Sequence, residues 1–191
     1  MTIRVRTGSD ADVAALLPLY DEAVQWLTAQ GRQGQWGTQL WSRRPELVAR
    51  LDRVARNGEL RVAETGTGDL AGALWLTSAP GYAPAASEPE VYLEGFVVAR
   101  RFAGCGVGQV LLEAARSEAA GRGVRQLRLD CWGRRRSGPG PLLRAGWLHR
   151  HRPAHRPGRG RLGGCAPGSA PDAYSMRVNL YRIYALEIHS H

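Results

Sequence analysis

The sequence predicts one α/β (α+β) domain built on a mixed sheet that is flanked by helices. First, its 191 residues, 43% of them hydrophobic, are enough for one domain with a sizeable core. Second, segments with strand and helix periodicity follow in the order strand, helix, helix, strand, strand, strand, helix, strand. Third, a glycine-rich turn joins a strand to an amphipathic helix within residues 91–132.

The first part of the chain predicts a strand and two helices. Ile3–Thr7 alternates like a strand, and Ser9 with Asp12 has the spacing of a capping box. The helix that follows contains Pro18, which we expect to kink it, and ends at Gly31. Its apolar face consists of Val13, Leu16, Leu17, Tyr20, Val24 and Leu27.

A second helix begins at Pro45 and ends at Gly58, with Leu47, Leu51 and Val54 at helical spacing. In the loop between the helices, two tryptophans either line a substrate pocket or cover the core. They are Trp36 and Trp41.

Three strands and a third helix follow. The segments 59–65 and 70–77 predict a hairpin through the turn 66–69, and a Pro/Ala-rich connection at 82–89 leads to the strand 91–98. The third helix ends at Gly121, and a last strand ends near Cys131, a small residue that we expect to be buried. The residues of that helix expected to face the core are Val107, Val110, Leu111, Ala114 and Ala115.

The turn before the third helix is the strongest functional signal. Gly104, Gly106 and Gly108 fall within five residues at a helix N-terminus, where exposed N–H groups and the helix dipole form an anion site. A dinucleotide fold is the rival interpretation, and Asp130 resembles its ribose-binding acid. However, four residues separate strand from glycines, and the third glycine of G-x-G-x-x-G is missing.

The segment FVVARRFAGCGVGQVLLEAA resembles motif A of the GCN5-related N-acetyltransferase (GNAT) superfamily, and the order of elements over residues 3–132 is similar to that family. Ala103 stands where the family usually has Arg or Gln, and Arg100 or Arg101 offers charge nearby. The resemblance implies a mostly antiparallel GNAT-like acyltransferase fold. It also implies acetyl-CoA as co-substrate, direct attack on its thioester, and a small-molecule or peptide amine as acceptor.

The resemblance also implies roles for individual residues. Backbone at Phe96, Val97 and Val98 would hold the pantetheine arm. The pyrophosphate would be bound by Ala103, Gly104, Cys105, Gly106, Val107 and Gly108. Glu94, which the strand pattern places on the face of Phe96, is the candidate general base; alternatively it orients the amine or is a solvated strand residue.

Charge and cysteine content exclude several other classes. Three cysteines without metal-ligand spacing predict neither a disulfide framework nor a metal site. No apolar run is long enough to span a bilayer, so we expect a cytoplasmic protein without a membrane partner, and we leave a homodimer open. The formal charge of +9 comes from the end of the chain, yet the interleaving of aromatic and basic residues that marks single-strand binding is missing there until Tyr174, so nucleic acid is not the expected partner.

The sequence therefore divides into a GNAT-like but incomplete domain at 1–132 and an atypical Arg/Gly/Pro-rich tail at 133–191, which we expect to be partly disordered. In 133–172, 24 of 40 residues are Gly, Pro or Arg, and Leu142 stands where the family has a tyrosine that protonates the leaving thiolate. Lysine is absent throughout, which is typical of GC-rich genes. Codons exist for 142–147 that read Tyr-Tyr-Glu-Arg-Ala-Gly one base later, a family-like segment. A frameshift near Trp132 is therefore our hypothesis for the tail.

Overall fold

A six-stranded sheet forms the centre of the computed structural model, which describes residues 1–34, 36–130 and 175–179. The strands lie in sequence order, antiparallel from β1 to β4 and parallel from β4 to β6. Their bounds are β1 Ile3–Thr7, β2 Leu60–Thr65, β3 Leu70–Thr77, β4 Glu90–Val98, β5 Gln126–Asp130 and β6 Ser175–Asn179. The predicted mixed, mostly antiparallel sheet is confirmed.

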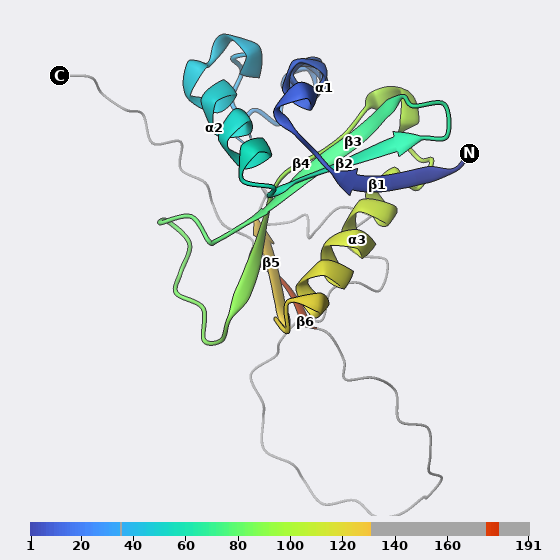
Figure 1. Ribbon diagram of the computed structural model, residues 1–191. Coiled ribbons are helices and arrows are strands. Elements are labelled where there is room, and N and C mark those ends of the chain that lie inside the picture. Colours follow the sequence, from blue (N-terminus) through green and yellow to red (C-terminus); the bar gives the residue numbers. More distant parts are fainter. Residues whose placement is uncertain (35, 131–174, 180–191) are drawn as a thin grey trace, which may run out of the picture.

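Helices cover both faces of this sheet (Figure 1). Helices α1 (Val13–Ala29) and α2 (Pro45–Arg56) pack on one face, and α3 (Val107–Gly121) packs on the other. Each face has its own core of buried side chains, one including Tyr20 and Trp75 and the other including Leu111. Three layers with two cores are the expected way to bury both faces of a sheet.

Most of the predicted helix faces are confirmed, with one error in α3. The capping box of Ser9 and Asp12 is present, at a short 3-10 turn before α1. Val110, which we expected to face the core, is exposed, and Leu112 is buried instead. Helix α3 buries only the side that meets the sheet. Because Val107 and Leu111 lie on that side, Val110 faces solvent.

The loop tryptophans cover the core. Trp41 is buried and stacks on Tyr20 with ring centroids 4.1 Å apart and planes at 7°. Trp36 packs against the same core and is partly buried. Asp21 accepts hydrogen bonds from the backbone N–H and the hydroxyl of Ser42, which ties this loop to α1. The alternative that these side chains line a pocket is not needed to explain their position.

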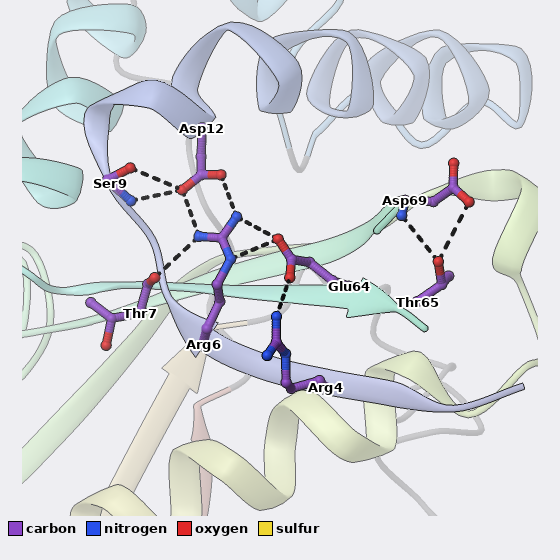
Figure 2. A network of polar contacts seen from close by, with 8 residues as sticks. All are labelled: Arg4, Arg6, Thr7, Ser9, Asp12, Glu64, Thr65 and Asp69. Carbon is purple, nitrogen blue, oxygen red and sulfur yellow. Dashed lines mark hydrogen bonds and ion pairs between the residues drawn. The ribbon is translucent and has the colours of Figure 1, made fainter. Parts of the chain in front are cut away.

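An ion-pair network joins β1, β2 and the start of α1 (Figure 2). The Arg6 guanidinium donates to both carboxylate oxygens of Asp12, at 2.8 and 2.6 Å, and to Glu64 at 2.6 Å. Arg4 donates to the other oxygen of Glu64. The hydrogen bonds of Arg6 lower the pKa of Asp12 and that of Glu64, while the pKa of Arg6 is raised by its bonds to Asp12 and then Glu64. The network anchors the edge strand to the rest of the sheet.

Several predictions concern residues outside the described part of the chain. The Arg/Gly/Pro-rich segment, the frameshift near Trp132, Leu142 and the burial of Cys131 all fall there. Ser175–Asn179 is described as strand β6 beside β5, an element that the sequence pattern did not predict.

Candidate functional site

A β-bulge in β4 shapes the candidate site. Val97 pairs with Ala73 of β3 and Glu94 pairs with Trp75, so β4 has one residue more than β3 between these pairs. Gly95 is the residue that permits it. Its φ is +58°, and a Cβ built there would lie 2.2 Å from the Trp75 ring. A residue with a side chain therefore fails at this position for two independent reasons.

After the bulge, β4 separates from β5. The parallel ladder between them runs from Glu90 to Leu93, and beyond Leu93 no described residue of β5 pairs with β4. The Ala99 N–H bonds to the Ala71 carbonyl, so by strand alternation Val97 also directs its backbone groups to β3. Phe96 and Val98 direct theirs away from β3, into the space that β5 leaves.

The bulge also corrects an expectation about faces. We expected Glu94 and Phe96 to share one face of the strand. Glu94 lies on the α1/α2 face beside Trp75, whereas Phe96 packs against the core on the α3 face. The extra residue at Gly95 changes the alternation, because side chains alternate with a period of two.

The glycine-rich loop exposes backbone donors at the start of α3. Gly104 and Gly106 adopt positive φ, +80° and +81°, and Gly106 is the N-cap residue of the helix. The N–H groups of Gly104 and of 106–109 have no acceptor among the described residues. Ala103 and Cys105 differ, because their N–H groups bond to the carbonyls of Arg100 and Phe102. A run of free N–H groups at a helix N-terminus is suited to an anion.

This loop and the unpaired edge of β4 lie at the same end of the sheet. Gly72 pairs with Val98, and a Cβ built on Gly72 would lie 3.3 Å from the Val107 side chain. Val107 and Gly108 are buried under the helix start, while residues 103–106 are exposed. Close packing of α3 on the sheet thus brings the free donors near the free strand edge.

The two arginines before the loop are already engaged. The Arg100 guanidinium lies over the Trp26 ring at 4.3 Å, and its backbone N–H donates to Glu22. Arg101 donates to the Leu70 carbonyl. Both remain exposed beside the loop.

Glu94 is held by three donors from two elements, α2 and β3. Its Oε2 accepts from Arg50 of α2 at 2.6 Å, from the Thr77 hydroxyl at 3.1 Å and from the Trp75 indole at 3.3 Å. Its side chain is 12% exposed. No described residue donates to Oε1. The carboxylate is therefore fixed in orientation with one oxygen still available.

Tyr20 fixes the bulge itself. Its hydroxyl donates to the Gly95 carbonyl at 2.6 Å, and burial raises the pKa of Tyr20 well above its usual value, so it stays a neutral donor. Sequence reasoning missed Tyr20, Gly95 and Arg50 as parts of this site. A lone glycine within an apolar strand was the one signal for the bulge.

Neither a membrane-length apolar helix nor a group of three or more potential metal ligands occurs in 1–34, 36–130 and 175–179.

Comparison with known sequences decides between the two interpretations of the glycine loop. A sequence model described as the acetyltransferase (GNAT) family matches residues 19–134. The chain belongs to this family. The match includes the bulge, the loop and α3 of this GNAT chain, and the dinucleotide alternative is set aside. No curated protein sequence matches the chain significantly.

Two solved structures of GNAT proteins, from Listeria monocytogenes and Thermoplasma acidophilum, share the fold. An acetyltransferase of the GNAT family from Listeria monocytogenes has a TM-score of 0.55 and 23% identity, covering 70% of this chain and 78% of that one. The PaiA N-acetyltransferase of Thermoplasma acidophilum, in complex with coenzyme A, has a TM-score of 0.56 and 18% identity, covering 71% and 82%. A GCN5-related N-acetyltransferase from Kribbella flavida matches at a TM-score of 0.47 and 16% identity, over 65% of this chain and only 28% of its own length.

Proposed function

We propose that this chain is an acetyl-CoA-dependent N-acetyltransferase that acts on a primary amine. The observation that supports it most is the coincidence of two sets of unpaired backbone groups at one end of the sheet. One set is on β4 after the bulge, and the other is at the start of α3. No side chain needs to supply the cofactor contacts, which explains why Ala103 is tolerated in place of Arg or Gln.

The residues present fit acetyl-CoA. Phe96 and Val98 offer amide groups to the pantetheine arm, and Val97 contributes its buried side chain to the strand. The 103–108 loop offers N–H groups to the pyrophosphate. The Thermoplasma protein with this fold was crystallised with coenzyme A, and we extend that ligand to this chain.

Glu94 is the proposed proton acceptor. An ammonium cannot attack a carbonyl carbon, so the acceptor must first lose a proton, directly or through water, and we assign this step to Glu94 Oε1. When bound, acetyl-CoA supplies the thioester carbonyl. There the amine nitrogen forms the new C–N bond, the C–S bond breaks, and the thiolate takes up the second proton of the nitrogen. We assign no side chain to that last transfer.

We further propose that residues 1–132 form the acetyltransferase domain and 133–191 the atypical tail. Because Leu142 stands at the expected tyrosine, we expect weak or no turnover. The cytoplasmic location and a homodimer are expectations that we carry forward.

Ligand titration tests the proposal. Acetyl-CoA should raise the melting temperature of the chain, and NAD should not. Stabilisation by NAD alone would refute an acetyltransferase. In Glu94→Gln, acetyl-CoA binding should be unchanged, while the weak thiol release expected of the native chain with an amine panel should fall to background. Unchanged thiol release would remove Glu94 as the base.

A further inference from the structure

Arg50 of α2 joins two elements, but unlike Arg6 and Arg61 it uses only part of its guanidinium to do so. Arg61 donates hydrogen bonds from all three of its guanidinium nitrogens, to Glu118 and to the carbonyls of Gly58 and Leu60. Arg6 likewise donates from all three nitrogens, to Asp12, Glu64 and the Thr7 carbonyl. Arg50 donates from Nη2 alone, to Glu94.

The guanidinium nitrogens of Arg50 that do not bond to Glu94 belong to a partly exposed side chain. This side chain is 36% exposed, and Nε and Nη1 have no acceptor among the described residues. A guanidinium is always charged, and Nη2 keeps a second hydrogen that forms a flat two-donor edge with Nε or with Nη1, which matches a carboxylate. An ion pair made only to stabilise the fold gains little at this exposure, so the free edge of the fork is the feature that requires an explanation.

Glu94 presents a matching free group. Its Oε2 is occupied by three donors, whereas Oε1 is not, and the two side chains are joined by a bond of 2.6 Å. A free anionic oxygen and a free cationic fork therefore lie one hydrogen bond apart. An acceptor with an amine and an anion on the same carbon satisfies both.

We propose that the acceptor is an α-amino carboxylate, with Arg50 binding the carboxylate while Glu94 handles the amine. This inference rests on the proposed acetyltransferase function and narrows its acceptor. A simple amine or a peptide N-terminus leaves the Arg50 fork without an anion. A polyamine places a second cation beside Arg50, which is repulsive.

The test compares matched acceptors on the full-length chain. Alanine, leucine and phenylalanine are each titrated against their decarboxylated amine and their amide, by calorimetry with saturating coenzyme A. For at least one side chain the acid should bind about tenfold more tightly than both analogues, as expected for a charge-assisted bidentate contact. Equal affinity across all three sets, or no binding of any acid, would overturn the inference.

Variants in α2 test whether Arg50 causes the preference for the acid over its amine and amide. Arg50→Gln should remove the preference for the acid, and Arg50→Lys should retain part of it. Arg53→Gln, which removes an exposed charge from the same helix, is the control and should change nothing. A full preference in Arg50→Gln would also overturn the inference. Should the variants not fold, the comparison on the native chain still decides it.

Acetyl-CoA titration on the same samples separates a failure of the proposed function from a failure of the proposed acceptor class. Failure to bind acetyl-CoA removes the proposed function, while acetyl-CoA binding with no acid preference removes only the role of Arg50.

Discussion

Two glycine-bearing turns of this chain each contain a glycine at nearly the same φ, and they have opposite hydrogen bonding. The turn between β2 and β3 has Gly68 at φ +85°, and the loop before α3 has Gly106 at φ +81°. In the first turn Gly66, Gly68 and Asp69 all donate their N–H groups to Thr2 or Thr65. In the loop, five N–H groups have no partner among the described residues.

Side chains explain this difference. The first turn contains threonines and an aspartate, which bond to the backbone and to each other. The Thr67 hydroxyl donates to Asp69 at 2.8 Å, and the Asp69 N–H donates to the Thr65 hydroxyl at 3.0 Å. Residues 103–108 have only apolar and cysteine side chains. A glycine turn that supplies its own acceptors is complete, whereas one without them is suited to an external anion.

The largest effect should come from Gly95, where space as well as backbone freedom is limiting. Gly95→Ala places a methyl group against the Trp75 ring, and Trp75 packs in the core beside Tyr20 and Trp41. We expect the free energy of unfolding to fall by about 3 kcal/mol or more, combining overpacking with a positive φ. Urea denaturation measures it.

Gly104→Ala is the control, since nothing lies within 4 Å of its built Cβ and only its φ of +80° opposes the change. Its cost should be about 1 kcal/mol. Equal costs for the two variants would mean that the bulge can relax around Trp75.

A carboxylate at the same backbone angle in each turn tests the comparison itself. Gly106→Asp puts negative charge among the free N–H groups, and we expect acetyl-CoA affinity to fall about tenfold or more by repulsion. Gly68→Asp has an equally exposed position and a matching φ, and its acetyl-CoA affinity should equal that of the native chain. Equal losses in both variants would contradict the assignment of the loop to pyrophosphate.

The turn between β2 and β3 should contribute to stability and not to acetyl-CoA binding. Thr65 is buried, and its hydroxyl accepts from Asp69 and contacts Thr67 at 2.7 Å. Thr65→Val removes these bonds, so the free energy of unfolding should fall by about 1 kcal/mol with no change in acetyl-CoA affinity. Weaker acetyl-CoA binding in this variant would show that the two turns are coupled.

Local pattern predicted most of the fold, and the site was predicted only where it depends on backbone. Strand and helix periodicity located β3 and α2, and three glycines located the loop. The face of Phe96 was wrong because one inserted residue at Gly95 shifts every later side chain, and a two-residue alternation contains no trace of such an insertion. Arg50 was missed because its partner Glu94 is 44 residues away, and only the packing of α2 on the sheet brings them together.

The smallest effect concerns the ion pairs of Arg6 beside the turn between β2 and β3, and it is a pH dependence of the free energy of unfolding (Figure 2). Arg6 lowers the pKa of Asp12 and of Glu64 in the folded chain. Their contribution to stability is therefore present above the pKa of an unfolded carboxyl, about 4, and is lost as the pH falls through the lower folded pKa. Urea denaturation between pH 6 and about 3 should show this decline, and Asp12→Asn should reduce its slope.

Asp10→Asn, an exposed carboxylate of the same turn without an ion pair in the described chain, should leave the slope as it is. If both variants behave alike, the loss of stability in acid arises from general charge repulsion, and Arg6 has no special part in it.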